Sequence, residues 1–418
     1  MFAPKPIAHQ EFLLSGNTQS RIAQAEIALA RIDERLRTSP IGKALKISLA
    51  RLEAISTIRI AGCSPDYETL LSIECQYGMY LQANKQGTMY DFLQLHPEFG
   101  EAEVETFKYL QTLLWLTATV VPGEPFEFDL MLDMHSLCLH GAPAKQTGSR
   151  FRKYDYQVPE EKAAHRLYRP ASPDEIDALI EDLYQFVNTE SYAPTAQAAL
   201  AHFQFECIKP FKNGLDRTGR AMCHAIMYRR GAFQNCIPPI ALMPALQTIE
   251  HTKLLLPYDM GVEIEGHERL RRIDEWTWFC GYSTELAAQM IGAYVDAFES
   301  LEQHWREKLG KFNKGSAMEM MLPLLIGTPV ITVSLAMAET GRSFSAVNDA
   351  INRLAEKGIL EVSAIGHERT RIFTAREVVD ALEDFIHDLS KQLPIARDKI
   401  YRKADGTLSV EEDKATSV

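Results

Sequence analysis

The sequence lacks several features that would assign it to a protein class at once. Its uncharged stretch 322–338 is interrupted by prolines and a glycine, whereas a membrane-spanning helix needs about 20 predominantly apolar residues. The first residues, MFAPKP, show neither the apolar core nor the cleavage site of a signal peptide. Seven cysteines are scattered and none forms a C-x-x-C pair, which disfavours a disulfide or zinc framework. We therefore expect a reduced, cytoplasmic protein without a membrane partner.

The chain also has no excess of positive charge. Its 418 residues carry a formal net charge of −12, which argues against a general polyanion binder and leaves room for a local basic patch only. Apolar residues make up 46% and charged residues 24%, as in ordinary globular proteins. A chain of this length is expected to form two or three domains.

Apolar residues recur at helical spacing through most of the chain. Helices are expected at 18–62 with a break at 39–42, and at 66–86, 101–120, 128–139, 170–187, 195–206, 216–230 and 276–309. The segment 141–158 is polar and alternates at Phe151, Tyr154 and Tyr156, which predicts a β-hairpin.

Residues 316–385 have the pattern of a winged helix-turn-helix. A first helix is expected at 332–338, a turn at Gly341 and a second helix at 343–357, followed by the strands of the wing. Arginine and asparagine suit phosphate and base-edge contacts, and the second helix would present such residues to DNA. The candidates for DNA contacts are Arg342, Asn348, Asn352, Arg353 and Lys357. Interspersed acids leave open a role in protein contact or dimerisation instead.

Residues 202–220, HFQFECIKPFKNGLDRTGR, carry the candidate chemistry. A glycine-containing turn that leads into a helix favours phosphate binding, because free N–H groups and the helix dipole attract anions. Four basic residues against Asp216 leave this loop at about +3 by formal count. Two interpretations stay open: a capped turn in an inert scaffold, or a site that binds a phosphorylated ligand without a metal.

The same segment resembles the core motif of Fic-domain proteins, His-Pro-Phe-x-Asp/Glu-Gly-Asn-Gly-Arg-x-x-Arg. The positions that match are Pro210, Phe211, Gly214, Arg217 and Arg220. In place of the family's His, acid, Asn and second Gly stand Lys209, Asn213, Leu215 and Asp216. The segment 140–152 resembles the family's target-positioning flap, to which Gly148 and Arg152 would belong. With the preceding helix and the winged helix, the likeness extends from about residue 20 to 385.

In Fic proteins the loop binds phosphates, the acid holds Mg²⁺ and the His takes the proton from a target hydroxyl, which usually receives AMP. By this resemblance the nucleotide-binding positions are Lys212, Asn213, Gly214, Arg217 and Arg220. Lys209, at the catalytic position, is a poor general base because a solvated lysine has a pKa of about 10.4. Asn213 brings no charge to Mg²⁺, and Asp216 is expected to cap the helix where phosphate would lie. ATP with Mg²⁺ is thus a weakened ligand, and no cofactor is certain.

Many Fic proteins also carry an inhibitory helix with the pattern Ser-Ser-x-Ile-Glu-Gly, whose Glu pairs with the second Arg of the core motif. The matching segment here is 57–62, TIRIAG, in which Ala61 replaces the Glu. Arg220 would then need solvent, another acid or a ligand as its partner.

The sequence predicts a mainly α fold in four parts: an N-terminal helical region at 1–110, a Fic core at 111–310, a winged helix-turn-helix at 316–385, and a helix end with a flexible tail at 386–418. His202 and His224 match no zinc spacing and are expected to be packed helix residues, so no metal site is expected. The first hypothesis is a degenerate Fic protein that works by binding, with a protein target, DNA or a second copy as partner. The alternatives are a transferase of AMP or another phosphate-containing group with altered chemistry, and a DNA-binding protein whose core senses a ligand.

Overall fold

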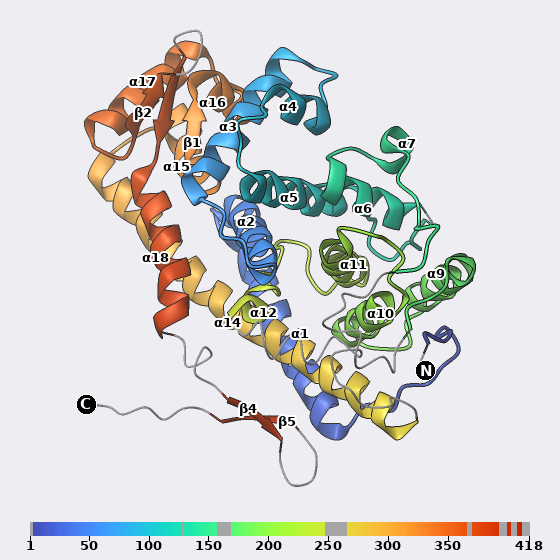
Figure 1. Cartoon of the computed structure of the whole chain (residues 1–418). Helices are drawn as coiled ribbons and strands as arrows, with labels where there is room; N and C mark the ends of the chain where they lie inside the picture. The colour runs from blue at the N-terminus through green and yellow to red at the C-terminus, as the bar shows by residue number, and fades with distance from the viewer. Residues whose placement is uncertain are drawn as a thin grey trace.

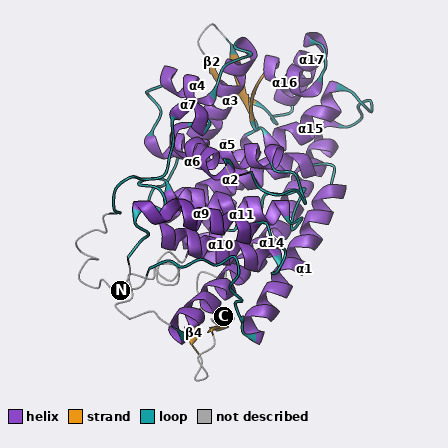
Figure 2. Cartoon of the chain, turned by 90° about the vertical axis from the view of Figure 1, so that its right-hand side faces the viewer, coloured by secondary structure: helices purple, strands orange, loops and turns teal. Residues whose placement is uncertain are grey.

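Helices form most of the computed structural model, which describes residues 3–127, 129–156, 169–246, 266–365, 370–392, 399–402 and 408–411 (Figures 1 and 2). The helices before the loop are α1 Gly16–Thr38, α2 Gly42–Ile60, α3 Tyr67–Ala83, α4 Met89–Leu95, α5 Glu101–Thr119, α6 Leu130–His140, α7 Ala144–Thr147, α9 Pro173–Val187 and α10 Pro194–Ile208. The helices after it are α11 Leu215–Arg229, α12 Leu242–Leu246, α14 His267–Leu309, α15 Ala317–Gly327, α16 Val333–Thr340, α17 Phe344–Glu356 and α18 Arg376–Gln392. The mainly α fold is therefore confirmed.

Helices α1 and α14 lie side by side along one flank of the molecule (Figure 1). Ser15 caps α1 and also donates a hydrogen bond to Asp274 on α14 at 2.8 Å. At the other end of the contact, Arg35 pairs with Asp296 and Glu299 at 2.7 and 2.8 Å. α14 runs for 43 residues without a break and so supports both the core and the C-terminal region.

Helix α10 is the centre of the core, because every residue from Thr195 to Ile208 is buried. It packs against α9, α11 and α14, and α11 in turn contacts α5 and α6. A helix buried on all sides must satisfy its polar side chains internally. Gln197 does so by donating to the carbonyls of Phe186 and Thr189, both at 2.9 Å. The polar side chains near the end of α10 belong to the candidate site.

A small antiparallel sheet lies in the C-terminal region, with the strand order β1-β3-β2. Its strands are β1 Val330–Thr332, β2 Glu361–Ile365 and β3 Arg371–Thr374. α16 ends at Gly341, which adopts the left-handed conformation with φ 62°, and α17 follows. The two expected helices and their turn are thus present, while the Gly366 turn of the expected wing lies outside the described residues. The winged helix stays a prediction.

One expectation about local structure is wrong. The expected hairpin at 141–158 is absent from its described part, 141–156, where the short helix α7 and an extended chain stand instead. Pro143 and Gly148 bound α7, and the backbone N–H of Arg152 bonds the carbonyl of Pro210 rather than a neighbouring strand, at 2.9 Å. In 386–418, where a helix end and a flexible tail are expected, α18 ends at Gln392 and an antiparallel pair follows, β4 Lys399–Arg402 with β5 Leu408–Glu411.

Within the described part of the chain, no helix combines the length and the apolar content that crossing a membrane requires.

Candidate functional site

The loop 209–214 joins the buried helix α10 to α11, and an unusual backbone conformation opens it. Lys209 is the C-cap of α10 and adopts the left-handed conformation, with φ 50° and ψ 63°. Among the described residues it is the only residue other than glycine with a positive φ. Such a conformation costs about 1 kcal/mol or more and persists only where the surroundings enforce it. The contacts of Lys209 with its surroundings should therefore explain why the loop adopts this backbone conformation.

The side chain of Lys209 turns inward. Its Nζ donates to Glu206 Oε2 at 3.2 Å, and both side chains are buried. The ring of Tyr156 lies over the same ammonium, 5.4 Å away. Burial raises the pKa of Glu206, and the nearby Lys209 opposes this shift. The group at the family's catalytic position is thus held in a buried ion pair below the loop.

Arg152 fixes the backbone of the loop from the opposite side. Its Nε donates to the carbonyl of Lys209 at 2.7 Å, and its Nη2 donates to the carbonyls of Ile208 and Ala171. These carbonyls include the last ones of α10, which have no partner within the helix. The expected flap residue is therefore a backbone clamp. Gly148 ends α7 in the left-handed conformation with φ 71°. No atom lies within 4 Å of the position that an added Cβ would take.

His135, on α6, is a site residue that sequence reasoning missed. Its ring stacks on Phe211 with centroids 3.6 Å apart and an interplanar angle of 4°. Nε2 lies 3.0 Å from the carbonyl of Asn213, and Nδ1 lies 2.7 Å from Ser149 Oγ. Since a carbonyl only accepts, Nε2 carries the proton and Nδ1 accepts from the serine hydroxyl. Burial lowers the pKa of His135 to about 4, so the ring is neutral at pH 7.

The tip of the loop faces solvent: Lys212, Asn213 and Asp216 are all exposed. Gly214 is the N-cap of α11 with φ 67°, and no side chain caps the first N–H groups. The expectation that Asp216 caps this helix is wrong, because it lies at the second helical position. The N–H groups of the first turn remain available to an anion, and the exposed Asp216 carboxylate opposes that anion by charge.

The two arginines of the motif have different surroundings. Arg217 Nη1 lies 2.9 Å from Glu105 Oε2 on α5 and forms an ion pair. Arg220 is 5% exposed and makes neither an ion pair nor a hydrogen bond with any residue that the structure describes. Of the four cations expected to charge the loop, Lys209 and Arg217 are therefore paired with acids outside it.

The expected inhibitory segment lies at the end of α2, but Ala61 is exposed there as the C-cap. Glu53, about two turns earlier on α2, is fully buried and accepts from the N–H of Ala241 at 2.8 Å. Its other oxygen lies 2.9 Å from His224 Nε2. The acid that α2 contributes to the core is thus engaged by His224 on α11 and by Ala241, just before α12, and does not pair with Arg220. His202 and His224 are buried helix residues, as expected.

The candidates for DNA contacts divide into two groups. Arg342, Asn352 and Lys357 are exposed, whereas Asn348 is half-buried. Arg353 does not point to solvent freely, because its Nη2 donates to the carbonyls of Leu309 and Lys311 at 2.6 and 3.2 Å. Arg353 therefore anchors α17 to the end of α14. For metals, the described residues hold no cluster of three or more His, Cys, Asp or Glu that would suit an ion.

Comparisons with known proteins match the part of the chain that contains this loop to a protein family. Residues 125–227 match the model of the Fic/DOC family. The chain is 29% identical over 180 residues to protein adenylyltransferase fic-1 of Caenorhabditis elegans, and 27% identical over 193 residues to its namesake in Caenorhabditis briggsae. The aligned segments cover 42% and 45% of this chain and 30% and 33% of the relatives, so the chain spans about a third of their length.

Solved structures similar to this chain carry the same family name. A Fic family protein from Desulfovibrio desulfuricans G20 gives a TM-score of 0.47 at 13% identity, covering 90% of this chain and 98% of that one. A fragment of fic-1 from C. elegans gives 0.45 at 17% identity, covering 66% of this chain and 71% of that one. On the match to the family model, around the loop just described, residues 125–227 of this chain form a Fic/DOC family domain.

Proposed function

We propose that this chain is a Fic-domain protein that acts by binding, as a regulator, and does not transfer AMP from Mg·ATP by the family's usual route. One observation carries the proposal: Lys209, at the position of the catalytic His, is buried and ion-paired with Glu206 at 3.2 Å. A general base must reach the target hydroxyl and have a free lone pair. A neighbouring carboxylate favours the ammonium form, which has none.

The other replaced positions support the same function. Asn213 is exposed at the position of the metal-binding acid and offers a neutral amide. Mg²⁺ prefers carboxylate ligands together with substrate phosphates, so its affinity at this loop should be low. Asp216 adds a negative charge beside the first turn of α11. Both changes weaken Mg·ATP without disturbing the fold of the loop.

The alternative is a transferase with altered chemistry, and the loop keeps some of what it needs. The first turn of α11 has no side-chain cap, and Arg217 and the exposed Lys212 lie next to it. A phosphate-containing donor could bind there without Mg²⁺. This function requires a covalent product, which the following experiment detects.

The decisive experiment compares the natural chain with a restored variant, Lys209→His, Asn213→Asp, Leu215→Asn and Asp216→Gly combined. Each protein is incubated with Mg·ATP and a panel of other phosphate-containing donors, and intact mass is measured. We expect no adduct on the natural chain and an AMP adduct on the restored variant. AMP transfer by the natural chain that disappears in Arg217→Ala would overturn the proposal. An adduct from another donor would establish the alternative.

ATP binding gives a second, independent test. Calorimetric titration of ATP into the natural chain, with and without Mg²⁺, is expected to show no gain in affinity from the metal. The variant Asn213→Asp should restore a gain of about tenfold or more, because it supplies the missing charge. A strong dependence on Mg²⁺ in the natural chain would contradict the proposed weakness of the metal site.

We further propose that this regulator binds DNA through α17. The exposed Asn352 and Lys357 carry this part of the proposal, since Arg353 is engaged by backbone carbonyls. Binding should weaken steeply with salt, and the double variant Asn352→Ala, Lys357→Ala should reduce both affinity and the salt slope. Glu361→Gln, an exposed change on β2, is the matched control. Equal affinity of all three proteins for DNA fragments from the chain's own gene neighbourhood would exclude this face.

A further inference from the structure

Arg220 is a buried cation without a counter-ion among the residues that the structure describes. Its residue is 5% exposed, its Nε has no hydrogen-bond partner, and no acid of the described residues lies within ion-pair distance. An unpaired buried charge destabilises a fold strongly, and native structures almost always neutralise one. Glu53, the acid that α2 contributes to the core, is engaged by His224 and the N–H of Ala241. A bound ligand is therefore a candidate for the counter-ion of Arg220.

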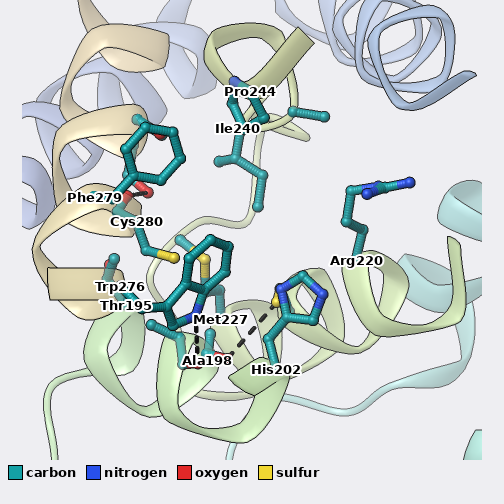
Figure 3. A pocket seen from close by; sticks show the side chains of 15 residues that line it. Thr195, Ala198, His202, Arg220, Met227, Ile240, Pro244, Trp276, Phe279 and Cys280 are labelled. Atoms are coloured by element: carbon teal, nitrogen blue, oxygen red, sulfur yellow. Dashed lines mark hydrogen bonds between the residues drawn. The ribbon is translucent and has the colours of Figure 1, made fainter. Parts of the chain in front are cut away.

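A cavity lies beside this arginine, between α10, α11, α12 and α14. Figure 3 shows Arg220 and His202 on one side of it, and Trp276, Phe279 and Ile240 on the other. His202 Nε2 is buried and has no hydrogen-bond partner either. Four unsatisfied polar atoms thus belong to residues that line a largely apolar space: Thr195 Oγ1 and His202 Nε2 on α10, Arg220 Nε on α11 and Ser283 Oγ on α14.

The size of the cavity limits what it can hold. Its volume is about 50 Å³, and one water occupies about 10–15 Å³ on this measure. About three to five heavy atoms therefore fit, on the order of a small organic anion and far fewer than a nucleotide needs.

The chemistry of the cavity lining favours some small anions over others. The hydroxyls of Thr195 and Ser283 could donate to an anion, but most of the lining, including Ala198, Ile240 and Phe279, offers no donors. Phosphate, with four polar oxygens, would therefore bury more polar surface without partners than a carboxylate with two. A monocarboxylate with a short alkyl chain instead places its charge at Arg220 and its carbons against the apolar wall. We propose that this cavity is a binding site for a short-chain monocarboxylate of the size of propionate, held by Arg220 and His202.

The geometry of the donors fits a single carboxylate. The Arg220 guanidinium supplies charge and N–H groups, and a neutral His202 with its proton on Nε2 supplies one more. Burial, with help from Arg220 and Lys209, lowers the pKa of His202 to about 3, so the ring is neutral at physiological pH. The site needs neither the exposed loop tip nor a metal, and it therefore goes beyond the function proposed above.

The test uses the full-length protein and sodium propionate, with sodium chloride keeping the ionic strength constant. Propionate is expected to raise the melting temperature and to give a saturable calorimetric signal, whereas the neutral propionamide gives neither. Arg220→Met keeps the length of the side chain and removes its charge, and should weaken propionate binding at least about tenfold. Ala198→Leu, which fills the cavity from α10, should do the same while Arg220 stays in place. Arg217→Met, an arginine change away from the cavity, should bind propionate normally.

Three outcomes would overturn the proposal. The first is no propionate binding by the natural chain, and the second is unchanged binding by Ala198→Leu or by a folded Arg220→Met. The third is binding of inorganic phosphate in preference to propionate, which would place a phosphate group at Arg220. Because ATP binding at the loop is tested through Asn213 and propionate binding through Arg220, failure of one site is distinguishable from failure of the other.

Discussion

At the scale of single residues, the site is defined by how its buried charges are neutralised. Lys209 and Glu206 neutralise each other below the loop, and Arg217 pairs with Glu105. Arg220 has no such partner among the described residues. A buried pair is weak evidence for stability as a whole, but removing one member leaves the other charge buried and unpaired.

The Lys209–Glu206 pair predicts the direction in which the stability of the protein changes with pH. Lys209→Met should destabilise the protein at pH 7 by about 3 kcal/mol, because Glu206 then loses its ion-pair partner. Glu206 has a raised pKa in the folded state, so the fold binds more protons than the unfolded chain above pH 4.5 and loses stability as pH rises through that window. The variant should extend this loss to higher pH, as urea unfolding at pH 5 and pH 8 would show.

The control for that experiment is the double variant Lys209→Met, Glu206→Gln. It removes both charges and should recover most of the stability at pH 8, since the neutral amide has no cost of burying a charge. Equal stability of the single and double variants at both pH values would mean that the pair carries no charge in the fold.

His135 predicts a change of stability with pH in the opposite direction. Its pKa is about 4 in the fold and 6.5 as the ordinary value. Between these values the unfolded chain binds the proton and the fold does not, so stability is lost as pH falls from about 6.5 to about 4. The shift corresponds to at most about 3 kcal/mol. His135→Gln should flatten this part of the stability profile measured by urea unfolding, whereas a curve parallel to that of the natural chain would contradict the neutral ring.

At the scale of elements, the C-terminus of α10 depends on a side chain from the extended segment before α9. Arg152 donates to the carbonyls of Ile208, Lys209 and Ala171, and so replaces the partners that a helix end lacks. The left-handed Lys209 is stable because both its backbone and its side chain are held.

Arg152→Ala should therefore cost about 2–3 kcal/mol and loosen the loop locally, since several charge-assisted hydrogen bonds are lost. Amide hydrogen exchange at Lys209 and Phe211 should accelerate more than exchange in α14. Arg150→Ala, an exposed neighbour, serves as the control and should leave both rates unchanged. Equal amide exchange rates in the two variants would show that the loop keeps its conformation without Arg152.

At the scale of the whole molecule, the C-terminal region is built into the helical core. Gly327, at the end of α15, lies directly against the backbone of Ala44 on α2: an added Cβ would be 2.9 Å from its Cα and 3.0 Å from its carbonyl oxygen. The carbonyl of Gly327 also accepts from the buried Arg51 at 3.0 Å. This contact joins residues that are almost 300 positions apart in the chain.

Gly327→Ala should accordingly destabilise the molecule by about 1–3 kcal/mol, because neither backbone can move aside easily. Gly16→Ala is the matched control: nothing lies within 4 Å of the added Cβ, and the change should be neutral or slightly stabilising. Thermal unfolding of the two variants decides the matter. A melting temperature of Gly327→Ala equal to that of the natural chain would mean that α15 separates from α2 at little cost.

The sequence predicted the long helices well and the site contacts poorly, for physical reasons. Periodic apolar residues locate α1, α2, α10 and α14, because burial of one face determines where a helix forms. The pairing of Glu206 with Lys209 follows a helical spacing of three and could have been recognised.

The contacts that cross the fold could not be read in this way. His135 reaches Asn213 across 78 positions, and no motif links the two residues. The alternation at Phe151, Tyr154 and Tyr156 predicted a hairpin because it resembles a strand, but the chain there bonds to the loop instead of to itself. Arg353 was expected to face DNA, and only the position of the carbonyls of Leu309 and Lys311 shows its engagement.

Helix α14 is about 65 Å long at the usual rise per residue. It carries Trp276 beside the cavity near one end and the carbonyl of Leu309 that holds α17 at the other. A rigid rod of that length acts as a lever: a tilt of about one degree around one end moves the other by about 1 Å. A small displacement of α14 beside Trp276 would thus become a movement of about 1 Å at Leu309. A shift of that size is enough to weaken the hydrogen bond between Arg353 and the carbonyl of Leu309.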